Sequence, residues 1–279
     1  MADFYSQADQ DYDLNIMDSC LTSRERDLPD PLTIPFFHDF ILFLNHLKEH
    51  PIQKTKTGSI SIKPILPLLN QFKDNRHLLE IRKMGWELHR EDEYNALLQI
   101  KIIALNMYII YNRKEYLYLS KNGRGYLDKV DPLAQYSAMV LHYWYRTNWD
   151  YISPTHPCGK SNFGEIIYQN QNELWQILLK EKDKWLDFES FANTLISYLH
   201  LNDYFKNTYD PHEDSQFSIN LAVYFDLFAH NLLRFGIVEF EPFTPKSTWQ
   251  DLPYQNNARF RLTPMGIYIL EQALFHNYL

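Results

Sequence analysis

A candidate catalytic motif lies at residues 46–50, where the order His-Leu-Lys-Glu-His places His46 and His50 one helical turn apart. Two imidazoles at this spacing can hold a zinc ion, and Glu49 could then activate a water molecule. Pro51 ends the predicted helix directly after His50, and no third ligand is identifiable. Histidines are also favoured near helix C-termini because they complement the helix dipole. We interpret the motif as a helix end and keep a metal-dependent hydrolase as an alternative.

Other catalytic signatures are missing from the sequence. It contains no G-x-x-x-x-G-K-[ST], G-x-G-x-x-G or G-x-S-x-G, so it offers no phosphate-binding loop and no nucleophile elbow. The acidic residues 91–93 beside His89 are interpreted as charges that complement a helix N-terminus, and residues 212–214 as a solvated loop. We therefore predict no enzyme, no catalytic residue, no metal and no cofactor.

Charge is unevenly distributed along the 279 residues, whose formal net charge is −8. Residues 1–30 hold two Arg against eight Asp or Glu, and residues 51–130 hold fourteen Lys or Arg against eight acids. Residues 131–279 carry a net charge of −7. One basic segment, with a net charge of +6, therefore lies within an acidic chain.

The basic segment supplies the candidate nucleic-acid-binding residues, several of which fall at predicted turns where they could meet a phosphate backbone. The alternative is a solvated basic face without a partner. The candidates are Lys54, Lys56, Lys63, Arg113, Lys114, Lys121 and Arg124.

The length fits two modules, each with its own core. We predict an acidic flexible arm (1–30), a basic first module (31–150), a linker (151–165) and an acidic, aromatic second module (166–279). Residues 1–30 lack a signal peptide, and the apolar stretch 97–111 is too short and too polar to span a bilayer. Cys20 and Cys158 form no disulfide framework. These features predict a cytoplasmic protein without a membrane partner.

Apolar periodicity and the scarcity of glycine predict a mainly helical fold with small β elements. Helices are expected over 36–47, 61–72, 93–111, 133–149, 164–184, 188–201 and 219–235, and again after 262. Strands are expected over 116–119, 237–240 and 259–262.

A short pattern, [ST]-x-x-G-x-x-x-[IL], recurs at three places and indicates duplicated units. Its copies span residues 55–62, 120–127 and 263–270. At a strand-to-helix junction the Ser or Thr hydroxyl can accept an N–H group of the first helical turn. The glycine then allows that turn to lie close to a neighbouring element. Pro264 suits the first helical position of the last copy.

The order around the last copy, helix, Gly236, strand, turn, strand and capped helix, resembles the wing of winged-helix domains. Residues 51–72 and 119–127 are similar to winged-helix repeats in prokaryotic plasmid and mobile-element proteins, and to the N-terminal accessory domains of XPB-type helicases. The resemblance covers about half the chain and implies tandem winged-helix-like modules. It also implies that the helix before the wing can enter a DNA major groove while the wing touches phosphates.

The second module fits DNA less well, because its pre-wing helix has Asp226 where a groove reader needs cations. Its aromatic residues are typical of a core, with some at an interface. Our leading hypothesis is a non-catalytic winged-helix protein of a prokaryotic DNA-related system. Its first module would bind double-stranded DNA, and its second would bind a protein or another copy of the chain. The rival hypothesis is a purely protein-binding adaptor.

Overall fold

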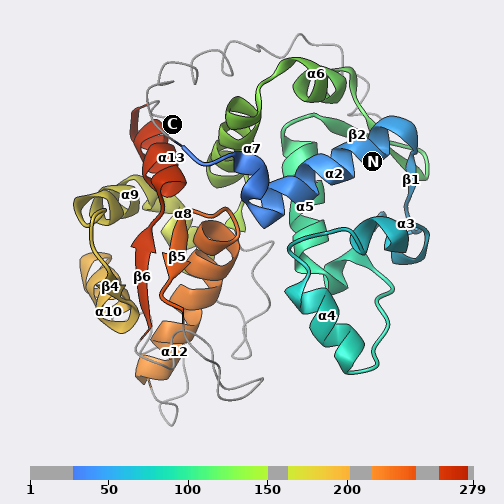
Figure 1. Cartoon of the computed structure of the whole chain (residues 1–279). Helices are drawn as coiled ribbons and strands as arrows, with labels where there is room; N and C mark the ends of the chain where they lie inside the picture. Colours follow the sequence, from blue (N-terminus) through green and yellow to red (C-terminus); the bar gives the residue numbers. More distant parts are fainter. Residues whose placement is uncertain (1–27, 150–162, 202–214, 243–257, 276–279) are drawn as a thin grey trace. The chain divides into compact units, whose positions relative to one another are not determined.

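The computed structural model describes residues 28–149, 163–201, 215–242 and 258–275, which are coloured in Figure 1. They are mainly helical and carry two small three-stranded antiparallel sheets, which confirms the predicted fold class. The chain divides into unit 1, Met1–Thr147, and unit 2, Asn148–Leu279. Most of the predicted arm and linker lie outside the described residues, as does 212–214. Throughout the described ranges, every helix is too short or too polar to cross a membrane.

Unit 1 alternates helices with a three-stranded sheet. Its elements are η1 (Pro31–Thr33), α2 (Pro35–Glu49), β1 (Ile52–Gln53), α3 (Ile62–Leu69), α4 (Arg76–Lys83), η2 (Glu91–Glu93), α5 (Asn95–Asn106), β2 (Ile110–Arg113), β3 (Tyr116–Leu119), α6 (Lys121–Lys129) and α7 (Pro132–Arg146).

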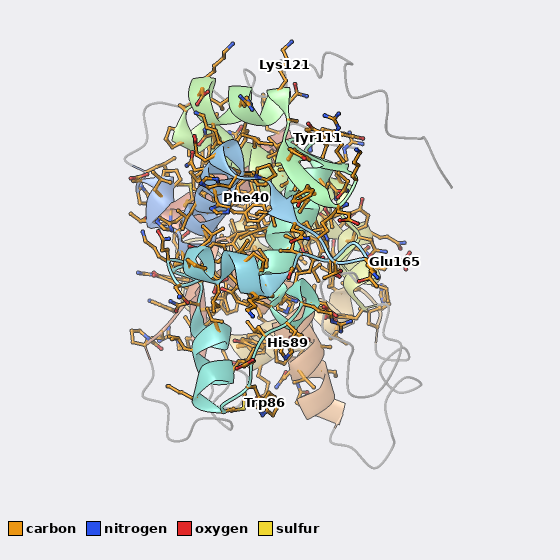
Figure 2. All side chains as sticks on the ribbon, turned by 90° about the vertical axis from the view of Figure 1, so that its right-hand side faces the viewer. Phe40, Trp86, His89, Tyr111, Lys121 and Glu165 are labelled. Carbon is orange, nitrogen blue, oxygen red and sulfur yellow. The ribbon has the colours of Figure 1, made fainter. Side chains whose placement is uncertain are left out.

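The core of unit 1 forms around α2, whose Phe37, Phe40 and Phe43 are fully buried. Phe40 lies in the interior (Figure 2) and meets the ring of Tyr126 edge to face, with 6.2 Å between centroids. Phe37 meets Tyr136 in the same way at 5.5 Å. Such aromatic pairs add attraction beyond the area that they bury. The α2 helix therefore anchors both α6 and α7.

Unit 2 repeats this plan. Its elements are α8 (Phe163–Gln169), α9 (Gln171–Lys180), β4 (Leu186–Asp187), α10 (Phe188–Tyr198), α12 (Ser215–Ala222), the π-helical segment η4 (Val223–Leu233), β5 (Val238–Phe240), β6 (Arg259–Leu262) and α13 (Pro264–Phe275).

Most of the aromatic residues that the structure describes in unit 2 are core, as the sequence favoured. Phe188, Phe228 and Phe260 are almost completely buried, and the Phe228 ring lies 4.7 Å from that of Phe260 and 5.0 Å from that of Phe188. Tyr198 and Phe275 remain exposed. The described aromatic residues of this half therefore mainly fill its interior.

The two sheets have the same strand order, β1-β3-β2 and β4-β6-β5, and all pairs are antiparallel. In each, the first strand follows a helix, and after further helices the other two strands form a hairpin that is itself followed by a helix. Each hairpin, β2–β3 or β5–β6, is called a wing below. The second and third copies of the sequence pattern begin at the equivalent ends of β3 and β6.

The junction after each wing uses one set of hydrogen bonds. Ser120 Oγ accepts from Gly123 N and donates to the carbonyl of Tyr108, and Thr263 Oγ1 accepts from Gly266 N and donates to the carbonyl of Gly236. The predicted caps are confirmed. Tyr108 and Gly236 also share positive φ, at 55° and 66°.

The glycines at these junctions are required by close backbone approach. A Cβ on Gly123 would lie 2.3 Å from the carbonyl oxygen of Ile109, and one on Gly266 would lie 2.0 Å from that of Ile237. Both distances are shorter than any real Cβ contact. The predicted close packing of the capped turn is therefore confirmed in both units.

Three expectations were wrong. Residues 55–62 are not a capped junction, because Gly58 N bonds the carbonyl of Thr55 in a turn with φ of 89°, and α3 begins later, at Ile62. The helix predicted to reach residue 111 ends at Asn106, where Tyr108 adopts positive φ and Ile110 enters β2. The helix predicted over 164–184 is two helices, α8 and α9.

Candidate nucleic-acid interface

All seven predicted nucleic-acid-binding residues lie in unit 1, but the structure does not gather them at one point. Lys56 is in the turn after β1, and Lys63 is in the first turn of α3. Arg113 and Lys114 belong to the first wing, and Lys121 and Arg124 lie on α6 directly after it. Lys54 follows β1 and is half-buried. Six of the seven are exposed, namely Lys56, Lys63, Arg113, Lys114, Lys121 and Arg124.

Lys54 faces the interior side of the sheet. Alternation along β1 places it on the side of buried Ile52, opposite to Gln53. Burial and the nearby Lys101 ammonium lower the pKa of Lys54, while the Glu91 carboxylate opposes this. Lys54 is therefore a poor candidate for a phosphate contact.

A buried ion pair joins the turn after β1 to α5. Glu91 is 3% exposed, pairs with the Lys101 ammonium and accepts from Ile60 N at 2.8 Å. Lys101 also donates to the carbonyl of Gly58 at 3.1 Å. Glu91 lies in the first turn of η2, at the helix N-terminus that the sequence predicted, and its tertiary contacts in addition bury it.

Glu93 also fulfils the expected helix-terminus role. Its carboxylate accepts from His89 N at 2.7 Å, and this hydrogen bond is the main reason that the pKa of Glu93 is lowered. Arg90 strengthens the effect through its backbone N–H and its positive charge. Glu91 and Glu93 therefore have different structural roles.

Three tyrosines lie on the outward side of the first wing, and we call them the tyrosine face: Tyr111, Tyr116 and Tyr118. Tyr111 and Tyr118 are cross-strand partners whose rings stack with centroids 5.6 Å apart and an interplanar angle of 22°. Tyr116 lies 6.3 Å from Tyr118. Tyr111 is 36% exposed and Tyr116 is 38% exposed. The alternating side chains of β3, Leu117 and Leu119, are buried beneath the sheet.

Cations lie at both ends of the tyrosine face. Arg113 is opposite Tyr116 in the register, and Lys114 follows at the hairpin turn with φ of 53°. At the other end, Lys121 and Arg124 are exposed on α6, and Figure 2 shows Lys121 extending from the molecule with Tyr111 on the neighbouring wing. Within the described part of the chain, no ion pair engages these four side chains.

The helix before the first wing is enclosed. All twelve residues of α5 are buried or half-buried, and its cation, Lys101, is paired with Glu91. A groove-reading helix must present side chains to base edges. The α5 helix is not arranged to do so, and the wing is the exposed basic element.

The second wing carries ion pairs where the first carries tyrosines. Arg261 pairs with Glu239 at 2.6 Å, and Arg259 pairs with Glu241 at 3.4 Å. The Arg261 guanidinium also lies 4.6 Å from the centre of the Trp185 ring. The positive charge of this wing is therefore compensated by its own carboxylates.

The histidine motif does not have the geometry of a helical zinc site. His46 belongs to α2, whereas His50 lies beyond its end with φ of −136°, and their ring centroids are 5.5 Å apart. Burial and the charge of His50 lower the pKa of His46. Among the residues that the structure describes, no three His, Cys, Asp or Glu side chains converge on a metal position.

Comparison with known proteins adds no relative, since no family model, curated protein or solved structure matches the chain. The interpretation of the first wing as a binding surface therefore depends on the structure of this chain alone. Sequence reasoning selected four of its cations but missed the tyrosines, although the alternation Tyr-Leu-Tyr-Leu signalled their strand.

Proposed function

We propose that the chain is a non-catalytic, tandem winged-helix protein of a prokaryotic DNA-related system, and that its first wing binds nucleic acid. The observation that carries this proposal is a set of four exposed cations that form no ion pair with any residue that the structure describes: Arg113, Lys114, Lys121 and Arg124. Residues 110–125 contain these four against one acid, Glu115, a net charge of +3. Such charges release counterions from a phosphate backbone when they bind it.

Salt dependence is the first test. With about four phosphate contacts, affinity should fall about 50-fold for a labelled single strand, and about 150-fold for a duplex, between about 50 and 200 mM salt. Fluorescence anisotropy measures this directly. The proposal fails if no binding occurs at about 50 mM salt.

Charge reversal locates the surface. The double variant Lys114→Glu/Lys121→Glu should weaken binding more than about tenfold, because it replaces two phosphate contacts with repulsion. Lys180→Glu/Lys182→Glu is the matched control, since both lysines are exposed in unit 2 and the net charge changes equally. Equal weakening in both variants would show a general charge effect and contradict the proposal.

A protein-binding function is favoured by a different feature, the exposed apolar residues around α4. Trp86 is 66% exposed, Leu79 45% and Met84 36%. Exposed aromatic residues are enriched at interfaces. Self-association through this region predicts a concentration-dependent sedimentation coefficient that Trp86→Ser abolishes. A constant monomer value for the unmodified chain would contradict it.

A further inference from the structure

The tyrosine face is unusual for the outward side of a small sheet. Side chains on the solvent side of an antiparallel sheet are usually polar. Here Tyr111, Tyr116 and Tyr118 occupy this side, and Tyr108, just before β2, is 56% exposed. The equivalent side of the second wing is charged and internally paired. Among the described residues of the two wings, the aromatic surface therefore belongs to the first wing and is not required by the shared topology.

The chemistry of this surface combines π-faces with unpaired cations. The Tyr116 ring is tilted by 56° to that of Tyr118, so these two rings do not stack on each other. Arg113 is the register partner of Tyr116, and Lys114 follows it. Aromatic rings beside cations are how proteins hold unpaired bases and the phosphates that join them.

The dimensions also suit a single strand. From Tyr116 to Ser120, β3 rises by about 13 Å, so Lys121 and Arg124 flank one end of the tyrosines and Arg113 and Lys114 flank the other. A backbone crossing the face would meet cations before and after the rings. A duplex would leave the rings unused, because its bases are stacked on one another and present only their edges.

We infer that the first wing binds single-stranded nucleic acid, with bases stacked on Tyr116 and on the stacked pair Tyr111–Tyr118, and phosphates held by Arg113, Lys114 and Lys121. This inference rests on the proposed function and names its substrate class. It differs from the sequence-based expectation of double-stranded DNA. The enclosed α5 helix supports the difference, since the helix that precedes the wing does not present its side chains to a groove.

The test compares three labelled probes by fluorescence anisotropy: an oligothymidine of about 12 nucleotides, a duplex of equal length and an abasic strand. The full chain should prefer the oligothymidine to both others by about tenfold or more. Tyr116→Ala and Tyr118→Ala should each weaken oligothymidine binding about tenfold, because base stacking on the ring is lost.

Matched variants separate stacking from folding. Tyr116→Phe and Tyr118→Phe should retain binding, since stacking needs the ring and not the hydroxyl. Tyr116→Leu keeps apolar bulk without a π-face and should bind as weakly as Tyr116→Ala. Tyr198→Ala, at a tyrosine in unit 2 that is 51% exposed, should leave binding unchanged.

The outcomes distinguish the two proposals. If duplex and single strand bind equally and the tyrosine variants behave as wild type, while Lys114→Glu/Lys121→Glu weakens binding, the single-strand inference is wrong and the proposed function stands. If none of the three probes binds at about 50 mM salt, both are wrong. A protein partner would then be the occupant to test on this face.

Discussion

The two wings occupy equivalent positions in their units but present different surfaces. Both follow a helix and a short connection that contains a residue with positive φ, and both end at a hydroxyl that caps the next helix. The outward side of the first wing has stacked tyrosines and unpaired cations. That of the second has Arg259 and Arg261 paired with carboxylates. The shared topology therefore sets where side chains point, and the side chains decide what the surface can bind.

The junction glycines test whether the two wings are structurally equivalent. Gly266→Ala and Gly123→Ala should each destabilise the protein by more than about 3 kcal/mol, because the new Cβ would overlap rigid backbone. Urea unfolding followed by circular dichroism measures the loss. Gly125→Ala is the control, since a Cβ there meets nothing within 4 Å. A cost at one junction but not at the other would break the equivalence.

The Glu91–Lys101 pair tests whether a buried ion pair contributes more to stability than the exposed pairs of the second wing. Glu91→Gln should cost about 3 kcal/mol, because it leaves the Lys101 charge enclosed without its carboxylate. Glu91→Gln/Lys101→Met should recover part of this loss, since no unpaired charge remains. Both changes are measured as shifts in the midpoint of urea unfolding. A smaller loss for the single variant than for the double would contradict the argument.

His142 gives unit 1 a pH dependence. The pKa of His142 is lowered from its usual 6.5 to about 4. Burial of the imidazole is the main cause, and the positive charge of Arg146 adds to the effect. Stability is therefore complete above pH 6.5 and falls as the pH drops toward 4, because the unfolded chain binds a proton that the folded chain excludes. The loss should reach about 2 kcal/mol after allowance for partial solvation.

The His142→Gln variant checks this assignment, since glutamine does not titrate. Unfolding free energies measured from pH 7 to 4 should decline less steeply in the variant than in the unmodified chain. Identical slopes would show that other groups cause the decline.

The smallest expected effect concerns the paired arginines of the second wing. Glu239→Gln/Glu241→Gln should change stability by less than about 1 kcal/mol, because these ion pairs are exposed. Affinity for oligothymidine should rise by less than about tenfold, because cations are freed without tyrosines beside them. A larger gain, reaching that of the first wing, would show that charge alone accounts for binding.

Local signals allowed much of the fold to be predicted. Apolar residues recur at helical spacing from Phe36 to Leu47, ahead of Pro51. The α2 helix follows this pattern because its apolar face is buried. The strand over 259–262 and the caps at Ser120 and Thr263 depend on neighbouring residues alone. The same kind of signal misled at Thr55, since a Ser or Thr three residues before glycine also fits a tight turn.

The candidate surface was harder to predict. Its cations were selected because of their type, yet Lys54 was included although the sheet turns it toward Lys101. Tyr116 and Tyr118 gave a strand signal without showing which side would face solvent. That depends on the pairing of β3 with β1 and β2 and on the helices covering the inner side.

The sequence by itself therefore determined most of the helices, two of the three repeated caps and the basic character of unit 1, because periodicity, capping and charge depend on near neighbours. Only the tertiary structure decided that α5 is enclosed, that Glu91 is buried against Lys101, and that tyrosines and unpaired cations share one face. Those properties arise from contacts between residues distant in the chain, which no local pattern specifies.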